Sequence, residues 1–326
     1  MLTDILIINS ELSSLPPLLM IKPSSFLRRV STLACLAAIG FGSAFGSSLP
    51  AEGGKCMMWK ATNGTNVVYL LGSIHIGSKK MYPLAKPIED AYSASKTLVV
   101  EVNLNKVNPM DSMGYVTEVG MYKGDDNLWK HIKPATTDRV KEFCQTYGMA
   151  PTMLGMFKPW LVSVELEVLP LQKAGMDLNL GIDKYFLDRA AKPNSGKTVE
   201  QIEDAQFQLK LLSALPEDES DEYLTYSMGE SKSQVQEEPK LESLWLNGNA
   251  DEMDKVTSQL PDRLKPFMRK LLQDRNPHMA DVAEKFLKSG EKCFFVVGTA
   301  HLVGQEGVIA LLKKRGYSVF QVDAKP

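Results

Sequence analysis

Two glycine–histidine segments of this sequence carry the side chains best suited to chemistry. In "VVYLLGSIHIG", His75 stands three residues after Gly72, at the end of an apolar, β-rich run. In "CFFVVGTAHLVG", near the other end of the chain, His301 stands in the same relation to Gly298. The chain has only four histidines, and glycine makes up 23 of 326 residues, so chance would give this spacing less than once. The repeated context predicts that the two histidines act together.

Paired imidazoles in this position indicate a metal site. In open α/β sheets, ligands bind at the carboxyl ends of parallel strands, in the loops that lead to the next helix. A glycine there lets the backbone turn tightly, so that a side chain three residues later reaches over the edge of the sheet. If the two strands are neighbours, His75 and His301 meet, and two neutral imidazoles are the usual start of a divalent-metal site. The alternative, a structural hydrogen-bonding role for each histidine, does not account for the repetition.

Two glutamates and one arginine are candidates for the rest of the site. Glu101 lies in the apolar run "LVVEVNL", where an unpaired charge would be costly, although alternation with Val99 and Asn103 also permits a solvated face. Glu203 ends "TVEQIE" before a helix, where the alternative role is a favourable interaction with the helix dipole. Carboxylates are natural ligands for manganese-like or zinc-like ions. Arg275 in "DRNPHM" is suited to clamping a carboxylate or stabilising an oxyanion.

Other catalytic motifs are absent or incomplete. The segment "SGKT" imitates the end of a phosphate-binding loop, but Ala191 stands where that loop needs glycine, and a helix precedes it. The sequence has no H-E-x-x-H zinc motif and no G-x-S-x-G nucleophile elbow. His131 and His278 have no supporting context, so we expect them to be surface or helix-cap residues.

Residues 1–46 look like a secretory signal. Arg28 and Arg29 precede the apolar stretch "VSTLACLAAIGFGSAF", and "AFG" fits cleavage after small residues. The apolar stretch is too short and too rich in small residues for a comfortable membrane span. We place the true start at Met20, which shortens the basic leader. The sequence therefore predicts a periplasmic or secreted protein with no membrane span in the mature chain.

Charge and cysteine content exclude several classes. The net charge of −2 gives no reason to expect nucleic acid as a partner. Outside the leader the cysteines are Cys56, Cys144 and Cys293, and no C-x-x-C pair occurs. An odd number allows at most one disulfide, or three reduced thiols. A disulfide framework, a redox motif and a cysteine-based zinc knuckle are not expected.

The elements that must position the candidate residues follow an α/β order. The strands "GTNVVYLLGSIH" and "TLVVEVNL" are separated by the helix "PIEDAYSASK", which indicates a parallel βαβ unit, and Asn63-Gly64 is typical of a hairpin turn. A third strand, "KTVEQIE", enters the helix "DAQFQLKLLSAL", whose apolar face includes Phe207, Leu211 and Leu215. Near the C-terminus, "KCFFVVG", "EGVIALLKKRG" and "YSVFQVD" are predicted as strand, helix and strand.

Strands thus cluster at both ends of the chain, with a long helical middle region between them. We predict an α/β fold with a central, largely parallel or mixed sheet and flanking helices. Residues 47–326 are expected to form one domain, with helical insertions at about 105–180 and 218–290.

Seven segments, in order, resemble the TraB/GumN family, to which the Tiki membrane proteases also belong. The segments are "YLLGSIHIGSKKMYPL", "LVVEV", "FKPWLVSVEL", "GIDKYFLDRA", "VEQIEDAQFQL", "DRNPHMA" and "FFVVGTAHLVGQEGVIALLKKRGYSV". The resemblance runs from about Trp59 to Val322, essentially the whole chain after the leader. One departure is that the family often has L-E-T where this chain has "IED" around Glu203.

The resemblance implies an α/β domain whose paired G-x-x-H segments form the active site. For the Tiki branch it implies metal-dependent peptidase activity, with manganese or cobalt favoured and zinc as an alternative. His75 and His301 match the motif histidines, as metal ligands. Glu101 matches the acidic residue of the following strand and Glu203 the one before the Q-x-L helix, as ligands or proton carriers. Arg275 matches the arginine of the "RN" element.

These observations favour a secreted or periplasmic metal-dependent hydrolase, in the first instance a peptidase. Its substrate would be a peptide or a small molecule. Two alternatives stay open. The first is a non-catalytic protein that sequesters a peptide, haem or metal, and the second is a metal-free esterase that uses histidine as general base. The family also includes members linked to peptide pheromone shutdown and to polysaccharide gene clusters.

Overall fold

The computed structural model describes residues 54–229 and 241–325 around one six-stranded sheet. The strands are β1 (Lys55–Asn63), β2 (Asn66–Ser73), β3 (Thr97–Val100), β4 (Thr198–Gln201), β5 (Cys293–Gly298) and β6 (Ser318–Asp323). Their order is β4-β3-β5-β2-β1-β6, parallel from β4 to β2 and antiparallel where β1 pairs with β2 and with β6. The predicted α/β class with a mixed sheet is confirmed. The predicted leader, residues 1–46, lies outside the described ranges.

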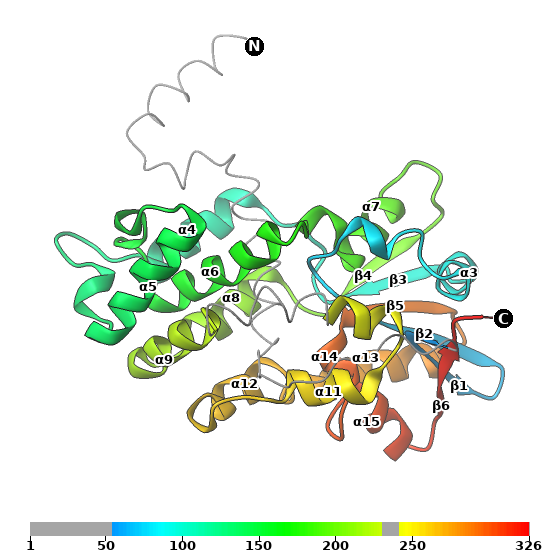
Figure 1. Ribbon diagram of the computed structural model, residues 1–326. Coiled ribbons are helices and arrows are strands. Elements are labelled where there is room, and N and C mark those ends of the chain that lie inside the picture. The colour runs from blue at the N-terminus through cyan, green and yellow to red at the C-terminus, as the bar shows by residue number, and fades with distance from the viewer. Residues whose placement is uncertain (1–53, 230–240, 326) are drawn as a thin grey trace, which may run out of the picture.

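Helices of the described residues form two groups with separate hydrophobic cores (Figure 1). Those that pack on the sheet are α3 (Lys86–Ala94), α7 (Ile182–Ala190), α11 (Ala250–Thr257), α13 (Asn276–Ser289), α14 (Thr299–Leu302) and α15 (Val308–Lys314). Those of the second core are α4 (Pro109–Gly120), α5 (Pro134–Tyr147), α6 (Pro159–Lys173), α8 (Ala205–Ser213), α9 (Glu217–Ser227) and α12 (Lys265–Leu271). The long helical middle region predicted from the sequence supplies most of this second group.

The two glycine–histidine strands are direct neighbours in the sheet. β2 and β5 pair in parallel, with Ser73 opposite Gly298. β3 pairs with the other side of β5, with Val100 opposite Val296. The carboxyl ends of three parallel strands therefore meet at one edge of the sheet, where α/β proteins place their ligands.

β3 is shorter than predicted, which places Glu101 just outside the strand. The strand ends at Val100, so the alternation that would put Glu101 on a solvated face does not continue. Glu101 is only 4% exposed, and the solvated-face alternative is therefore wrong. Strand-like pairing persists for one more step in the backbone, because the Glu203 amide donates to the Glu101 carbonyl at 2.9 Å. The two glutamates consequently lie side by side where β3 and β4 end.

The hairpin turn at Asn63-Gly64 is confirmed, but the strand that precedes it was not predicted. β1 pairs antiparallel with β2 up to Asn63 opposite Asn66, and Gly64 adopts a positive φ of 59° in the turn. β1 reads "KCMMWKATN", in which Thr62 is the one β-branched residue of the kind that marks strands in a sequence. Burial of Met57 and Met58 in the sheet core outweighs this weak local preference.

Lys197 of the "SGKT" segment has a structural task. Its ammonium donates to the carbonyls of Tyr92 (2.6 Å), Ser93 (3.3 Å) and Ser95, at the end of α3. It also lies 4.5 Å from the centre of the Tyr92 ring. A cation at a helix C-terminus satisfies carbonyls that have no partner within the helix. This engagement agrees with the rejection of a phosphate-binding loop.

The cysteines of the described residues are reduced and buried. Cys56, Cys144 and Cys293 are free thiols, in agreement with the second of the two predicted states. Burial raises the pKa of both Cys56 and Cys144 to about 11, and it also raises the pKa of Cys293. These thiols are therefore protonated near neutral pH and unsuited to nucleophilic attack.

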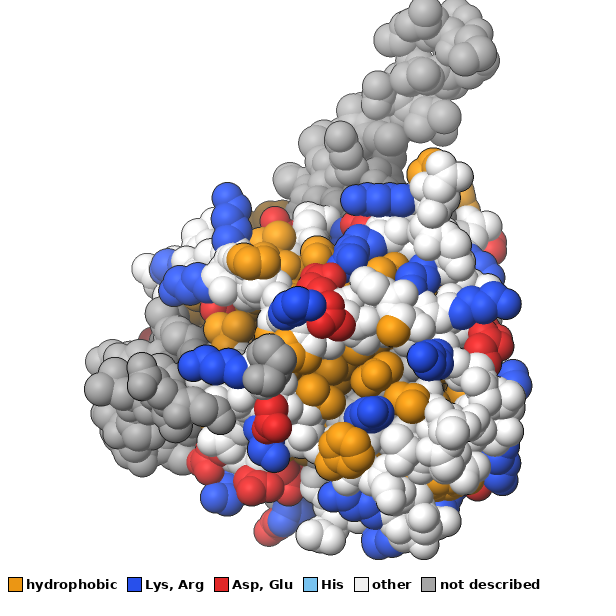
Figure 2. All heavy atoms as spheres, turned by 90° about the vertical axis from the view of Figure 1, so that its right-hand side faces the viewer, with side chains coloured by type: hydrophobic (Ala, Val, Ile, Leu, Met, Phe, Trp, Pro, Cys, Tyr) orange, Lys and Arg blue, Asp and Glu red, His pale blue; other side chains and the backbone are white. Residues whose placement is uncertain are grey.

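The described helices differ from a membrane span in length or apolar character, and charged side chains lie on the surface. Among residues 54–229 and 241–325, no helix combines the length and apolar character that a membrane span requires. On the side of the molecule that lies at the right of Figure 1, acidic and basic side chains are interspersed around an apolar area (Figure 2).

One carboxyl group is buried in the second core. Among the described residues, no cation contacts it. Glu167 of α6 is 6% exposed, and its carboxyl accepts a hydrogen bond from the Tyr223 hydroxyl at 3.0 Å. Burial raises the pKa of Glu167 to about 8, although the hydrogen bond from Tyr223 opposes the shift. The group is therefore largely protonated at neutral pH, which avoids the cost of a buried charge.

This raised pKa predicts a loss of stability as pH rises. In the unfolded chain Glu167 loses its proton at about pH 4.3. In the native state it keeps the proton up to about pH 8, so the two states differ between these values. Stability should therefore fall through that window, by roughly 3–5 kcal/mol in total. Glu167→Gln stays neutral and should match the parent near pH 5 but unfold at a higher temperature near pH 9. Calorimetric melting across pH checks this, with exposed Glu142→Gln as control, and equal pH profiles for parent and Glu167→Gln would contradict it.

Candidate functional site

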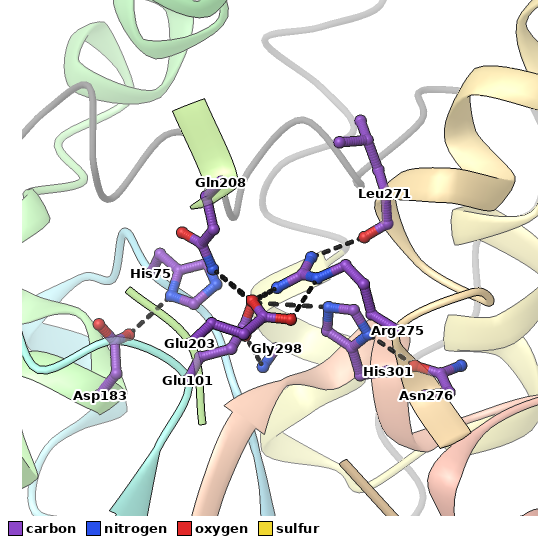
Figure 3. Close-up of polar contacts among 10 residues, drawn as sticks. All are labelled: His75, Glu101, Asp183, Glu203, Gln208, Leu271, Arg275, Asn276, Gly298 and His301. Carbon is purple, nitrogen blue, oxygen red and sulfur yellow. Dashed lines mark hydrogen bonds and ion pairs between the residues drawn. The ribbon is translucent and has the colours of Figure 1, made fainter. Parts of the chain in front are cut away.

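The structure brings all five predicted site residues into one buried cluster at the carboxyl ends of β2, β3 and β5 (Figure 3). The cluster comprises His75, Glu101, Glu203, Arg275 and His301. Glu101 lies at its centre, and the other four side chains are placed around that carboxylate. The two histidines, 226 residues apart in the sequence, thus face a common group.

Arg275 clamps both glutamates. Its Nε donates to Glu203 Oε1 at 2.9 Å, and its Nη2 donates to Glu203 Oε2 at 2.5 Å and to Glu101 Oε1. Its Nη1 donates to the Leu271 carbonyl at 2.6 Å. Arg275 directly precedes α13, so the start of that helix fixes its position. Of the two predicted roles for Arg275, the structure displays the carboxylate clamp.

Gln208 is a further donor to the same carboxylates. From α8, its Nε2 donates to Glu101 Oε1 at 3.0 Å and to Glu203 Oε2 at 3.3 Å. The other oxygen of Glu101 accepts from the Gly298 amide at 3.1 Å. The central carboxylate is therefore held by a strand end, by the start of one helix and by a helix of the second core.

The ring of His301 is oriented by Asn276. His301 Nδ1 lies 2.7 Å from Asn276 Oδ1. The amide orientation is fixed because Asn276 Nδ2 donates to the Glu306 carbonyl at 2.9 Å, which leaves the oxygen to face the ring. An oxygen acceptor requires a proton on Nδ1, so the neutral ring carries its lone pair on Nε2. That nitrogen faces Glu101 Oε1 at 3.6 Å.

The ring of His75 is oriented by Asp183. His75 Nδ1 lies 2.8 Å from Asp183 Oδ1, and the same oxygen accepts from the Ser73 hydroxyl at 2.7 Å. The carboxylate requires a proton on Nδ1, so His75 also carries its lone pair on Nε2 when neutral. Both histidines therefore direct the ligand-type nitrogen toward the inside of the cluster, with a polar group behind the ring, as metal-binding histidines do.

Gly298 provides the space in which these side chains converge. A Cβ built on Gly298 would stand 3.4 Å from His75 Nε2, 3.6 Å from Glu101 Oε2 and 3.6 Å from His301 Cδ2. A cavity of about 30 Å³ adjoins the same glycine and both imidazoles, with apolar side chains on its far wall. A cavity of that size holds a water-sized group.

The expectation that the motif glycines bend the chain is wrong. Gly298 has ordinary dihedral angles (φ −48°, ψ 136°), and Gly72 lies inside β2 without a positive φ. What each position needs is the absence of a Cβ. At Gly72 a Cβ would stand 2.7 Å from Thr299 Oγ1 and 3.1 Å from Met57 Cγ. Gly72 therefore allows β2 to pack closely, whereas Gly298 leaves room for the site.

The electrostatic balance of the cluster is negative. Burial alone would raise the pKa of Glu101, but the guanidinium of Arg275 outweighs it and holds this pKa well below its usual value. Burial also opposes ionisation of Asp183, yet His75 and the hydrogen bond from Ser73 lower its pKa. Burial, aided by Arg275, lowers the pKa of His301, so this ring is neutral. Glu101 and Glu203 face the Arg275 guanidinium, and Asp183 lies behind His75. When both imidazoles are neutral, these three carboxylates outnumber the one guanidinium, which leaves an excess negative charge that a bound cation would offset.

The residues of the cluster fit a divalent ion in their chemistry but not in their present arrangement. The donor types, the Nε2 lone pairs of His75 and His301, and the excess negative charge all fit one. However, within the described ranges no three His, Cys, Asp or Glu side chains are gathered so that they could hold a metal ion as they stand. The carboxylate oxygens of Glu101 and Glu203 are engaged by Arg275 and Gln208 instead. The complete four-ligand set therefore stays a prediction.

A wider hollow opens on the outer side of the clamp. It has a volume of about 560 Å³, a size typical of small-molecule and peptide subsites. Glu203 and Arg275 line it, together with Phe207 and His278. The hollow therefore reaches the charged side chains of Glu203 and Arg275, which belong to the same buried cluster as His75 and His301.

Three residues of the site were missed by sequence reasoning. Asp183 and Asn276 orient the histidines from 108 and 25 residues away, and no local pattern marks them. Gln208 was not predicted because the sequence pattern placed Phe207 on the buried face of its helix. In the structure Phe207 is 40% exposed, and Gln208, which is 1% exposed, lies on the buried face instead. The sequence offers only Gly181, two residues before Asp183, as a hint of close packing; in the structure a Cβ there would stand 2.3 Å from the His75 carbonyl.

The remaining histidines lie at the surface or at a helix end, as expected. His131 ends a short 3₁₀ helix (Leu128–Lys130) and pairs with Asp126 at 2.8 Å and with Glu217. His278 is an exposed residue in the first turn of α13, at the wall of the outer hollow.

Comparison with known proteins agrees with the arrangement of these motifs. The model of the TraB/PrgY/gumN family matches residues 57–321, which include every site residue described above. The chain belongs to this family. The match covers all six strands apart from the first residues of β1 and the last of β6, so the family sequence pattern and the sheet coincide.

Relatives within this family carry names without an assigned activity. The chain is 27% identical to "Uncharacterized protein YbaP" of Escherichia coli (strain K12) over 154 residues, which is 47% of this chain and 54% of that protein. A YbaP of Shigella flexneri matches equally, so the chain spans about half the length of these two relatives. An "Uncharacterized protein" of Treponema pallidum (strain Nichols) is 19% identical over 274 residues, 79% of this chain and 80% of that protein. No solved structure gives a significant match.

The different tasks of the motif glycines predict different outcomes for alanine. Gly72→Ala overpacks β2 against Thr299 and should lower the free energy of unfolding by about 1–3 kcal/mol. Gly298→Ala makes only ordinary contacts, so the protein should melt near the parent temperature while its methyl group fills the space between the imidazoles. Thermal melting with and without Mn²⁺ measures both effects. A Gly298→Ala protein that responds to the ion like the parent would contradict this role.

The carboxylate clamp predicts strong coupling between Arg275 and Glu203. Arg275→Gln leaves two buried carboxylates without their cation and should cost about 3–5 kcal/mol in urea unfolding near pH 7. Adding Glu203→Gln should recover part of that loss, because one of the uncompensated charges is removed. Arg263→Gln, in an exposed pair with Asp218, is the control and should change stability by less than about 1 kcal/mol. Additive effects of the two substitutions would rule out the clamp.

Proposed function

We propose that this protein is a metal-dependent hydrolase, in the first instance a peptidase. The observation that carries the proposal is the convergence of two imidazoles and one carboxylate at Gly298. Both rings direct Nε2 inward, and His301 Nε2 lies 3.6 Å from Glu101. The site is at the sheet edge where α/β proteins bind ligands, and the buried cluster carries excess negative charge. The expected ion is Mn²⁺ or Co²⁺, with Zn²⁺ as the alternative.

His75, His301 and Glu101 would hold the ion. A bound divalent ion supplies a water of lowered pKa and polarises a carbonyl group. Glu203 is placed to carry the proton between that water and the leaving group, because it lies beside Glu101 and lines the outer hollow. Arg275 keeps both carboxylates in place, which limits them to the orientations seen in the cluster.

The substrate would approach through the outer hollow. Its volume of about 560 Å³ accommodates one or two residues of a peptide, and its inner wall is formed by Glu203 and Arg275. The apolar leader sequence supports a periplasmic or secreted location for this reaction, in which case the substrate is an exported or extracellular peptide.

Chelation tests the proposal. The mature chain should melt at a lower temperature after EDTA treatment and recover on addition of Mn²⁺ or Co²⁺, because an ion that binds only the folded state stabilises it. Hydrolysis of a quenched peptide library should follow the same order. His301→Ala should abolish the thermal response and hydrolysis, whereas His131→Ala, outside the site, should leave both unchanged. Full hydrolysis in EDTA would overturn the proposal in favour of metal-free chemistry.

A sequestering protein gives a different pattern. It would retain its peptide, haem or metal in stoichiometric amounts without any turnover. Single-turnover and multiple-turnover mass spectrometry of the same peptides separates these cases, since only a hydrolase yields more product than protein.

A further inference from the structure

The two glycine–histidine motifs are alike in sequence but differ in the group behind each ring. His75 Nδ1 faces the carboxylate of Asp183 at 2.8 Å, whereas His301 Nδ1 faces the carboxamide of Asn276 at 2.7 Å. All four side chains are buried. One ring is therefore backed by a full negative charge, and the other by a neutral dipole.

Asp183 is fixed by the strand that carries His75. It is the second residue of α7, and its backbone amide donates to the Ser73 hydroxyl at 3.3 Å while that hydroxyl donates to its carboxylate. Ile182 donates to the Ile74 carbonyl at 3.0 Å, and Gly181 allows the backbone to lie against His75. The carboxylate is thus held in place by contacts on both sides of the histidine.

Asn276 is fixed just as firmly, but its chemistry is different. Its Nδ2 donates to the Glu306 carbonyl at 2.9 Å, so its oxygen must face His301. An aspartate in its place would set a carboxylate oxygen against that carbonyl. The neutral partner at His301 is therefore part of the packing around it.

We propose that Asp183 is a positioning residue that makes His75 the stronger of two unequal metal-binding histidines, with His301 the weaker. The proposal rests on the proposed function. A carboxylate behind an imidazole fixes the ring and increases the electron donation of its opposite nitrogen, and removal of such a partner costs 10–100-fold in metal affinity. A neutral carboxamide fixes the ring without that increase. The paired motifs thus contribute unequally, with His75 as the anchor of the ion.

Metal binding to the mature chain tests the proposal without any assay of turnover. Mn²⁺ alone is titrated by calorimetry into the parent, Asp183→Asn, Asn276→Ala and Asp188→Asn. Asp183→Asn keeps the shape and the acceptor oxygen and should bind Mn²⁺ 10–100-fold more weakly. Asn276→Ala should lose less, and Asp188→Asn, an exposed residue of the same helix paired with Lys184, should bind like the parent.

The outcomes separate this inference from the proposed function. A parent that binds no Mn²⁺, Co²⁺ or Zn²⁺ overturns both. A parent that binds, together with Asp183→Asn within twofold of it or Asn276→Ala weaker than Asp183→Asn, overturns only the inequality of the histidines.

A second measurement covers an Asp183→Asn protein that fails to fold. In the metal-free parent, nitrogen NMR of the histidine rings should show His75 with its proton on Nδ1 and in a strong hydrogen bond, stronger than that of His301. His75 protonated on Nε2, or a stronger bond at His301, would overturn the proposal.

Discussion

The structure depends on one buried carboxylate that must be neutralised and hydrogen-bonded on every side. An ion such as Glu101 is costly away from water unless charged and polar partners surround it, and removing one partner costs more than the pair contributes. Its donors come from a strand end (Gly298), from the start of α13 (Arg275) and from α8 (Gln208). Because α8 belongs to the second core, the same carboxylate joins the sheet to the helical group. The site is therefore also a structural junction, and the elements that flank it are held in register by its chemistry.

The three central parallel strands were predictable, because β2, β3 and β5 are strongly apolar runs and a glycine lies at or next to the end of β2 and β5. The neighbouring placement of β2 and β5 followed from the repeated motif and the rule that ligands meet at carboxyl strand ends. β1 was not predictable from local preference, since its stability derives from pairing with β2 and from buried methionines. The end of β3 was misjudged by four residues, because alternation continues in the sequence after the backbone has left the sheet.

Four of the predicted site residues were within reach of sequence reasoning because His75, Glu101, Glu203 and His301 are ionisable groups that closely follow strands. Arg275 stands in a polar segment before a helix, and the family resemblance supported its assignment. The partners of these residues were not within reach. Asp183 and Asn276 are common residues on helix starts, and only the fold brings them behind the imidazoles. Gln208 illustrates a more general difficulty, because a polar residue on a buried helix face opposes the hydrophobic pattern used to find that face. A prediction that assigns only apolar residues to buried positions will therefore miss the polar partners of buried charged groups.

The position of β5 in the sheet has a consequence for biosynthesis. This strand lies between β3 and β2 at the centre of the sheet, yet it comes next to last in the chain. The edges of β2 and β3 can therefore be covered only after almost the whole polypeptide has been synthesised. Such a fold has many contacts between residues distant in sequence, which slows folding. Until then β2 and β3 expose unpaired edges, which favours aggregation or capture by chaperones. If the chain is exported as proposed, the late arrival of β5 would keep it unfolded long enough to cross a membrane.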